Sequence, residues 1–376
     1  MDITLKNGIT PRGRVTLPPS KSEAIRAALL LALAGDDPMR AAEGFPAPYC
    51  GDLSSALKAA GDLRSAHAGE SAALMRMLMP VQAALFGRIS VGADGALLNR
   101  GFGELERCFG VSLEPLGGRI ETRVNIRRKR RFTIDCSRTS QFLSGLLIAL
   151  PLLDRECAIT VENRLVSQPY AEMTLDFVRL FGGAVERTET GYRTFPSRYA
   201  APETIPVTGD ASYAAVFEAM DLLGGEVETV GGSFATRQPD AEFLRCASER
   251  DVDITDCPDL LPLLAAVACG REGETVIHGT ARLRTKESDR EAATVKLIRD
   301  LGGAAEAGSD RVTVRGSGGL AGGVCDSLND HRIAFAAAVL AQICRAPVTV
   351  KNAGCTEKSA PGFWEDYGRL TADERR

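Results

Sequence analysis

The chain has 376 residues, of which 44% are hydrophobic and 25% are charged, and its formal net charge is −4. This composition is typical of a globular protein that is long enough for two or more domains. Apolar stretches such as Ala27–Ala34 are too short to span a bilayer, and Met1–Arg14 lacks the apolar region of a signal peptide. We therefore expect a cytoplasmic protein with neither a membrane nor a nucleic acid as partner.

The ten cysteines lie at least eleven residues apart and mostly in apolar surroundings. This spacing gives no CxxC pair, so free thiols in a reducing compartment are the expected state. With only three histidines in the chain, we expect no metal site.

The first strong helix signal is the segment LPPSKSEAIRAALLLALAGD at residues 17–36, which follows a strand-like N-terminal stretch. Ser20 or Ser22 alone would cap such a helix, yet Lys21 and Arg26 are added near the same end. Backbone N–H groups and the helix dipole favour an anion there. An ordinary capped surface helix is the alternative, whereas a Walker loop would need glycines that this segment lacks.

Further along, several apolar helices end in glycine and are followed by an alternating strand. The copies are KAAGDL at 58–63, RCFGVSLE ending at residue 114, RLFGGAVE ending at 186, DLLGGEVE ending at 228 and RDLGGAAE ending at 306. Glycine after the last helical turn is the expected left-handed C-cap. The pattern predicts an α/β protein built from repeated helix-strand units.

The run IRRKRRF at Ile126–Phe132 is the one strongly basic segment. Because strand-like residues flank it, a solvated hairpin is the favoured interpretation. Binding of nucleic acid there is the alternative.

Five later segments carry more polar groups than capping requires. They are SRTSQFLSGLL at 137–147, NRLVSQPYAEMTL at 163–175, RLRTKESDREAATVKLIRDLGG at 282–303, SLNDHRIAFAAAVLA at 327–341 and GCTEKSAPGFWEDY at 354–367. Cations at helix starts are disfavoured by the dipole unless an anion is bound, although Glu287 and Arg290 could also form a simple surface pair. A strongly positive cleft for two anionic substrates is predicted from Lys21, Arg100, Lys286, Arg290, Arg332 and Lys358.

Taken in order, these segments resemble the EPSP synthase family, the 3-phosphoshikimate 1-carboxyvinyltransferases. The motifs are PPSKSEAIR, LLNRGFGEL, TSQFLSGLL, VSQPYAEMTL, GDASYAAVF, PDLLPLLAA, ARLRTKESDR, LNDHRIAFA and GCTEKSAPGFWEDY, spread over residues 17–370. The resemblance implies a two-domain enolpyruvyl-transferase fold, an inside-out α/β barrel with repeated βαβαββ units in each domain. It assigns residues 1–18 and 209–376 to the first, phosphoenolpyruvate-side domain and residues 19–208 to the second, shikimate 3-phosphate-side domain.

The family transfers the enolpyruvyl group of phosphoenolpyruvate to the 5-hydroxyl of shikimate 3-phosphate in aromatic amino acid (chorismate) biosynthesis. Addition gives a tetrahedral intermediate, and elimination then releases phosphate. The resemblance implies no metal and no organic cofactor, and the protein is expected to be a monomer. Such chemistry requires a proton donor, a base and stabilisers of negative charge.

The resemblance also implies the role of each site residue. Contacts to shikimate 3-phosphate fall on Lys21, Ser22, Arg26, Thr139, Ser140, Ser167, Tyr170, Asp259 and Lys286. Contacts to phosphoenolpyruvate fall on Lys21, Ala72, Arg100, Gln141, Arg290, Arg332 and Lys358. The catalytic set is Lys21, Asp259, Glu287, His331 and Lys358. Asp259 would orient or deprotonate the 5-hydroxyl, Glu287, with a pKa raised by enclosure, would carry the C3 proton, and His331 would assist proton transfer.

The chain departs from the family pattern at several positions, among them Glu70, Ile25, Gly101 and Arg282, and two departures carry specific expectations. Ala72 replaces a glycine that approaches phosphoenolpyruvate, so reduced sensitivity to the longer inhibitor glyphosate is expected. The segment between Asp52 and Glu70 is short, so one repeat unit of the second domain should be trimmed.

Two other functions compete with this interpretation. The sister enolpyruvyl transferase that acts on UDP-N-acetylglucosamine shares the fold and the donor, but the segments KESDR and NDHR favour the shikimate enzyme. A non-catalytic relative would keep the cleft, and the short segment and Glu70 motivate that alternative. Retention of Lys21, Asp259, Glu287 and Lys358 favours the enzyme.

Overall fold

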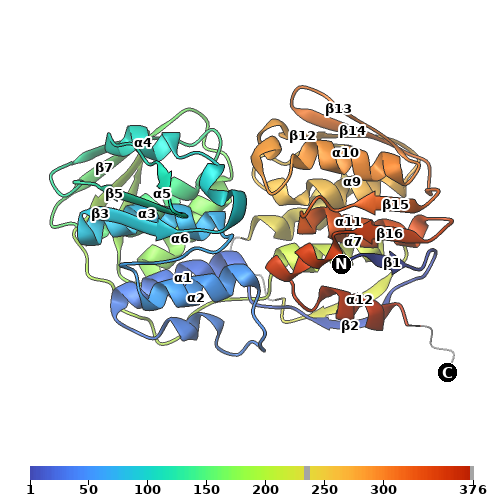
Figure 1. Cartoon of the computed structure of the whole chain (residues 1–376), viewed down its shortest axis with the longest axis horizontal. Helices are drawn as coiled ribbons and strands as arrows, with labels where there is room; N and C mark the ends of the chain where they lie inside the picture. Colours follow the sequence, from blue (N-terminus) through green and yellow to red (C-terminus); the bar gives the residue numbers. More distant parts are fainter. Residues whose placement is uncertain (233–237, 373–376) are drawn as a thin grey trace. The chain divides into compact units, whose positions relative to one another are not determined.

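The computed structural model describes residues 1–232 and 238–372, except for the side chains of residues 95 and 96. The described chain forms two compact α/β units (Figure 1). Unit 1 contains residues 1–18, 208–232 and 239–372, and unit 2 contains residues 19–207 and residue 238.

Unit 1 contains one complete βαβαββ repeat, in which helices connect the strands of a four-stranded sheet. Its elements are β11 (Asp251–Asp253), α9 (Leu261–Cys269), β12 (Gly273–His278), α10 (Arg290–Asp300), β13 (Ala304–Ala307) and β14 (Arg311–Gly316). The sheet order is β11-β12-β14-β13. The first pair is parallel, with Val252 opposite Ile277, and the other pairs are antiparallel. The parallel pair needs the α9 crossover, whereas the tight turn at residues 308–310 makes the hairpin.

The rest of unit 1 is built from both ends of the chain and from elements in its middle, at residues 211–230 and 239–248. Strand β1 (Ile3–Leu5) pairs antiparallel with β16 (Val348–Lys351), which pairs parallel with β15 (Gly323–Asp326). Strand β2 (Arg12–Thr16) pairs parallel with β10 (Glu226–Val230). The helices and turns are α7 (Ala211–Leu222), η4 (Pro239–Glu242), α8 (Phe243–Ser248), η5 (Pro258–Leu260), η6 (Ala281–Thr285), α11 (His331–Leu340), η7 (Ala341–Ile343), η8 (Ala353–Lys358) and α12 (Phe363–Leu370).

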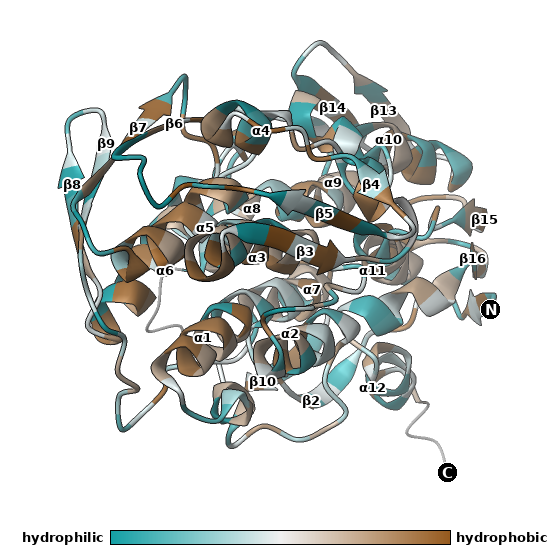
Figure 2. Ribbon diagram, turned by 60° about the vertical axis from the view of Figure 1, so that its left-hand side comes forward, coloured by the Kyte–Doolittle hydropathy of each residue, from teal (hydrophilic) through white to brown (hydrophobic). Residues whose placement is uncertain are grey.

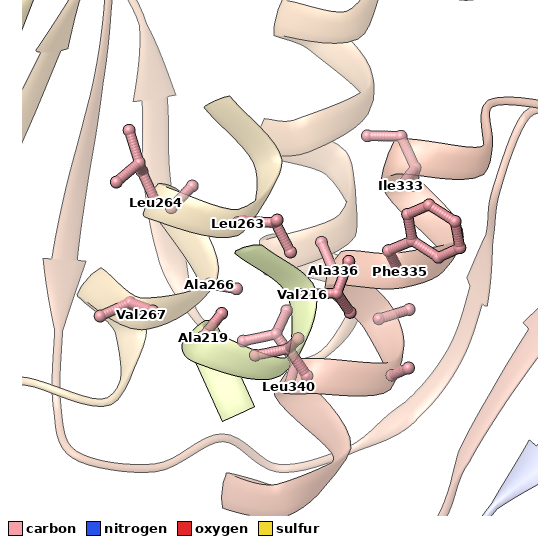
Figure 3. Packing of buried hydrophobic residues seen from close by; sticks show 14 of the residues in the cluster. Val216, Ala219, Leu263, Leu264, Ala266, Val267, Ile333, Phe335, Ala336 and Leu340 are labelled. Carbon is pink, nitrogen blue, oxygen red and sulfur yellow. The ribbon is translucent and has the colours of Figure 1, made fainter. Parts of the chain in front are cut away.

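Helices α7, α9 and α11 pack together at the centre of unit 1 (Figure 3). Val216 and Ala219 of α7, Leu263 of α9, and Phe335 and Leu340 of α11 are buried there. These helices are apolar on nearly all sides, as expected for helices enclosed by other elements. Burial of this apolar surface fixes the N-terminal ends of the three helices relative to one another.

Unit 2 repeats the same topology once in full. Its complete repeat consists of β6 (Arg131–Asp135), α5 (Gln141–Ala149), η3 (Leu150–Leu152), β7 (Cys157–Glu162), α6 (Gln168–Leu180), β8 (Ala184–Thr188) and β9 (Gly191–Phe195). The sheet order β6-β7-β9-β8 matches that of β11-β12-β14-β13 in unit 1, with the parallel pair again first. The expected βαβαββ repeat is therefore present in both units.

The other parts of unit 2 are reduced versions of the repeat. One consists of α3 (Ala72–Phe86), β3 (Arg88–Gly92), η2 (Gly95–Asn99), α4 (Gly103–Phe109), β4 (Pro115–Leu116) and β5 (Arg119–Arg123), in the sheet β3-β5-β4. A single parallel bridge between His67 and Gly92 stands where its first strand would lie. The other consists of α1 (Lys21–Ala34), η1 (Pro38–Ala42) and α2 (Gly51–Gly61), and residues 20–71, all described, form no strand.

The repeat pattern was wrong at its first copy, residues 58–63. Gly61 is the last residue of α2, with Asp62 as the C-cap, and no strand follows. Gly110, Gly182, Gly224 and Gly302 of the other copies do have positive φ and follow helices as predicted.

A second buried cluster forms the core of unit 2, and Figure 2 shows hydrophobic residues concentrated along α1, α3 and α5. Helix α5 lies so close to α3 that a Cβ on Gly145 would be 2.9 Å from the carbonyl oxygen of Arg76 and 2.9 Å from Pro80 Cγ. Glycine at this position lets the two helices approach, which fixes the start of α5.

The hairpin predicted around the basic run Ile126–Phe132 is wrong. Strand β5 before it pairs with β3 and β4, and strand β6 after it pairs with β7, so the run links two different sheets. Arg127 donates a hydrogen bond to the carbonyl oxygen of Leu85. All ten cysteines are free thiols, nine of them buried. Among the described helices, none has the length and hydropathy needed to cross a membrane.

Candidate active site

Four helix N-termini carry the polar residues that were singled out in unit 1. Asp210, Asp289 and Asp330 cap α7, α10 and α11 by accepting hydrogen bonds from backbone N–H groups at 2.9, 3.0 and 3.0 Å. Helix α9 begins directly after η5, which contains Asp259. These ends expose backbone N–H groups and positive dipole ends, which favour anionic ligands.

Arg290, at the first position of α10, is the centre of the unit 1 site. Its side chain is 1% exposed and donates four hydrogen bonds to three carboxylates. The distances are 2.6 Å to Asp259, 2.8 Å to Glu287, and 2.9 and 3.2 Å to Asp330. The surface pair suggested for Glu287 and Arg290 is therefore wrong, because both side chains belong to a buried network.

Two lysines and a histidine extend this network. Lys286 Nζ donates to Asp259 Oδ1 at 3.2 Å, and Lys358 Nζ donates to Glu287 Oε1 at 3.1 Å. His331 Nε2 lies 3.1 Å from the hydroxyl oxygen of Ser359. The structure thus brings Lys286, Lys358 and His331 to the same end of unit 1 as Arg290.

Arg332 is held more loosely than Arg290. Its guanidinium Nη2 is 3.4 Å from Asp259 Oδ2 and 3.9 Å from Asp240 Oδ2, and Nη1 is 3.4 Å from the carbonyl oxygen of Ser212. The side chain is 5% exposed, and Nε has no hydrogen-bond partner in the described chain. A buried guanidinium whose Nε–H has no acceptor can donate a hydrogen bond to a further anionic group.

The protonation behaviour of these cations follows their surroundings. Burial alone would lower the pKa of Arg290, but Asp330, Asp259 and Glu287 together raise it above its usual range. Burial also lowers the pKa of Arg332, but the charges of Asp259 and Asp240 outweigh this effect, so the pKa is raised. For Lys286 burial dominates and lowers the pKa, although Asp259 opposes the shift.

The unit 1 site contains as many acidic as basic groups. Its four cations are Lys286, Arg290, Arg332 and Lys358, and the four carboxylates facing them are Asp240, Asp259, Glu287 and Asp330. In this unit, each cation of the predicted positive cleft therefore has a carboxylate partner. Carboxylates and a lysine with a lowered pKa are suitable groups for moving protons beside a bound anion.

In unit 2, Lys21 opens α1 and its Nζ is 3.1 Å from Asp52 Oδ2 of α2. Asp52 is nearly buried, and its Oδ1 has no partner in the described chain. Ser20 occupies the N-cap position without a side-chain capping bond, so the simple serine cap considered for this helix is wrong. Its buried hydroxyl has no partner either, which leaves polar groups beside Lys21 open to a ligand.

Arg26 lies one turn further along α1, and its side chain is bound on several sides. Nε donates to Thr174 Oγ1 at 2.7 Å, Nη1 donates to the carbonyl oxygen of Ser22 at 2.6 Å, and Nη2 donates to that of Tyr170 at 3.0 Å. Burial lowers the pKa of Arg26 to about 10. This network joins α1 to α6 and sets the position of Tyr170.

The start of α5 collects the hydroxyl and amide groups predicted there. Ser140 Oγ donates to the carbonyl oxygen of Ser167 at 3.2 Å, and Thr139 Oγ1 accepts from the N–H of Gln141 at 3.2 Å. Arg76 of α3 donates to the side chain of Gln141 at 2.8 Å. The structure therefore brings the starts of α5 and α6 together, with Ser167 in a left-handed conformation at φ 53°.

The two remaining predicted residues lie on other elements of unit 2. Ala72 is the first residue of α3, after the N-cap Ser71, whose side chain accepts from the N–H of Leu74 at 3.4 Å. Arg100 is the C-cap residue of η2.

Sequence reasoning missed several residues that organise these sites. Asp330 was interpreted only as a helix cap, yet it also binds Arg290, and Asp52, Thr174 and Asp240 were not singled out. No local pattern marks them, because the cationic partner of each lies in a distant part of the sequence. Among the described residues, no cluster of three or more His, Cys, Asp or Glu side chains could hold a metal ion.

The βαβαββ repeats and the charged helix N-termini define the class of enolpyruvyl transferases. The sequence model of EPSP synthase (3-phosphoshikimate 1-carboxyvinyltransferase) matches residues 64–249 and 245–367. The chain belongs to this family.

Individual relatives agree with that assignment. A 3-phosphoshikimate 1-carboxyvinyltransferase of Methanocorpusculum labreanum is 30% identical over 424 residues, covering 96% of this chain and 97% of the relative. One of Clostridium kluyveri is 30% identical over 332 residues, covering 81% and 78%. The solved EPSP synthase of Acinetobacter baumannii has a TM-score of 0.74 with 98% of both chains covered, and at 19% identity it supports the fold.

Proposed function

We propose that this protein transfers the enolpyruvyl group of phosphoenolpyruvate to the 5-hydroxyl of shikimate 3-phosphate and releases phosphate. The observation that supports it most is the unit 1 network, in which Asp259 and Glu287 share Arg290 at the N-terminus of α10. Family membership supplies the substrates, and the residues at that network supply the groups that the reaction needs.

In this proposal unit 1 binds phosphoenolpyruvate and carries out the proton transfers. Arg290, Arg332 and Lys358 bind the donor's carboxylate and phosphate, since guanidinium groups match these anions in shape and charge. Four of the five N–H groups of Arg290 donate to carboxylates. One N–H on Nη1 is left to bind phosphoenolpyruvate.

The acid and base are assigned to the two carboxylates that Arg290 joins. Glu287, held by Lys358 at 3.1 Å, delivers a proton to C3 of the enol and removes one again during elimination. Asp259, held by Lys286 at 3.2 Å, orients or deprotonates the attacking 5-hydroxyl. His331 assists proton transfer at the tetrahedral intermediate, beside Ser359.

Unit 2 binds shikimate 3-phosphate through the starts of α1, α5 and α6. Thr139, Ser140 and Ser167 hold the 3-phosphate, and Tyr170 lies along the ring. The other residues proposed to contact shikimate 3-phosphate are Lys21, Ser22 and Arg26 of unit 2 and Asp259 and Lys286 of unit 1. The residues of unit 2 proposed to contact phosphoenolpyruvate are Lys21, Ala72, Arg100 and Gln141. We further propose that the protein acts as a monomer in the cytoplasm.

The proposal is tested by phosphate release from the purified full-length protein with each substrate alone and with both together. Release should require both substrates and should be lost in Lys21→Met and Glu287→Ala. Arg245→Met, an exposed change on α8, is the matched control and should keep wild-type turnover. Binding of shikimate 3-phosphate without any phosphate release would show a relative that has lost the chemistry.

A further inference from the structure

Asp240, on the turn η4, is a buried carboxylate that lies outside the helix starts described above. Only 1% of the residue is exposed, and Ser212 at the second position of α7 donates its hydroxyl to Asp240 Oδ2. The other carboxylate oxygen, Oδ1, has no hydrogen-bond partner in the described chain. A carboxylate removed from water with one unmatched oxygen is costly to maintain, so it requires an explanation.

Among the residues that the structure describes, the cation paired with this carboxylate is Arg332. Its Nη2 is 3.9 Å from Asp240 Oδ2 and 3.4 Å from Asp259 Oδ2, so two carboxylates attract one guanidinium. Neither contact has the 2.6–2.9 Å length of the three shortest bonds that hold Arg290. The position of Arg332 therefore depends on the balance between Asp240 and Asp259.

The groups around Asp240 belong to helices that pack together. Ser212 and Arg332 stand at the starts of α7 and α11, which pack against each other and against α9 through the buried side chains in Figure 3. Arg332 Nη1 also donates to the carbonyl oxygen of Ser212 at 3.4 Å. Because Ser212 contacts both partners, Asp240 is fixed relative to Arg332 by the packed helices rather than by a surface loop.

We infer that Asp240 is a positioning residue that counters the attraction of Asp259 for Arg332 and thereby keeps the guanidinium in place for the anionic donor substrate. This inference rests on the proposed function, in which Arg332 binds phosphoenolpyruvate. Without the charge on Asp240, Asp259 alone attracts Arg332, and the guanidinium shifts toward Asp259 and away from the donor.

The charge on Asp240 changes within an accessible pH range. Burial raises the pKa of Asp240 to about 6, with Asp259 and Asp210 adding to the rise and Arg332 and the Ser212 hydroxyl opposing it. The thiol of Cys257 is a further titratable group in electrostatic contact with this carboxylate. Asp240 is therefore charged and active in positioning above about pH 6, and the effect is lost as the pH falls below that value.

The test is the steady-state kinetics of Asp240→Asn against wild type between about pH 5 and pH 8. Asparagine keeps the volume and can still accept from Ser212, so only the charge is removed. At the upper end, KM for phosphoenolpyruvate should rise roughly tenfold, which corresponds to about 1.4 kcal/mol. KM for shikimate 3-phosphate should stay unchanged.

The most informative quantity is the KM of Asp240→Asn for phosphoenolpyruvate divided by the KM of wild type for the same substrate. Titration of phosphoenolpyruvate itself affects both proteins equally and cancels in this ratio. The ratio should fall toward one as the pH drops and wild-type Asp240 becomes protonated. A ratio near or below one at high pH, or an equal ratio at all pH values, would overturn the inference.

Two further variants separate positioning from general damage to unit 1. Asp221→Asn removes a different carboxylate, on α7, which accepts from the N–H of Val227 at 2.8 Å, and should leave both KM values unchanged. Ser212→Ala keeps the charge but removes a hydrogen bond that lowers the pKa of Asp240. The pH at which donor affinity is lost should then move upward.

Failure of the proposed function would be recognised separately, because wild-type protein would then release no phosphate. Calorimetric binding of inorganic phosphate to wild type and Asp240→Asn gives the same comparison without turnover. Weaker binding by the variant at high pH, with the difference vanishing at low pH, supports the positioning role. Equal binding throughout would contradict it.

Discussion

Replacing Arg290 by Met should destabilise unit 1 strongly. The change removes the common partner of Asp259, Glu287 and Asp330, and Asp330 is itself fully buried. Removing one partner of a buried ion pair typically costs about 3–5 kcal/mol, because an uncompensated charge remains. At roughly 2–4 °C per kcal/mol for a domain of this size, the melting temperature should fall by about 6–20 °C.

Urea unfolding followed by tryptophan fluorescence measures the predicted loss in the free energy of unfolding. Trp364 is the only tryptophan in the chain, and its indole N–H donates to the carbonyl oxygen of Ala353 at 2.8 Å within unit 1. Arg245→Met is the matched control, since Arg245 pairs with Glu242 and Glu249 on the surface. Exposed pairs of this kind contribute about 0–1 kcal/mol.

A double-mutant cycle identifies the cause. Adding Asp330→Asn to Arg290→Met removes the most deeply buried of the unpaired charges, so the double variant should be more stable than Arg290→Met alone. If Arg290→Met cost no more than the Arg245 control, the network would not be the buried, mutually dependent assembly that the distances indicate.

Three further substitutions test the role of Ala72, the close contact between α3 and α5, and the hydrogen bonds of Arg26. Ala72→Gly should increase inhibition by glyphosate, measured as its inhibition constant against phosphoenolpyruvate, at a cost of about 1 kcal/mol or less in helix stability; unchanged inhibition would show that the Ala72 methyl does not exclude the inhibitor. Gly145→Ala should lower stability by about 1–3 kcal/mol in thermal unfolding, because the new Cβ would meet Pro80 Cγ at 2.9 Å; wild-type stability would refute the close α3–α5 contact. Thr174→Val should cost about 1.5–3 kcal/mol, since Arg26 Nε loses its 2.7 Å acceptor, and a loss of only a few tenths would mean that Arg26 finds another partner.

Local sequence signals were sufficient for much of the fold. Glycines after helices, as at Gly182 and Gly302, and the alternation that follows them predicted the helix-strand order of the complete repeats. The same signal failed at Gly61, where the chain after α2 forms no strand. A C-cap glycine shows only that a helix ends, whereas strand formation also requires a partner strand to pair with.

The sequence singled out candidate site residues one by one, but it did not indicate the network that joins them. Lys286, Arg290 and Arg332 were identified because cations at helix starts are unusual, and Lys358 was identified in a loop ahead of a proline. Each of these cations has a carboxylate partner, and partners such as Asp240 and Asp330 come from distant parts of the chain. Pairing of this kind depends on the packing of α7, α9, α10 and α11, which local spacing does not contain.

The choice of acceptor substrate is the most direct test of the proposed transfer to shikimate 3-phosphate. The protein would be incubated with phosphoenolpyruvate and equal amounts of shikimate 3-phosphate and UDP-N-acetylglucosamine, and the products identified by mass spectrometry. The expected product is an enolpyruvyl ether of shikimate 3-phosphate, formed together with one equivalent of phosphate. The product should be absent with Glu287→Ala. An enolpyruvyl product on UDP-N-acetylglucosamine, or no product from wild type, would contradict it.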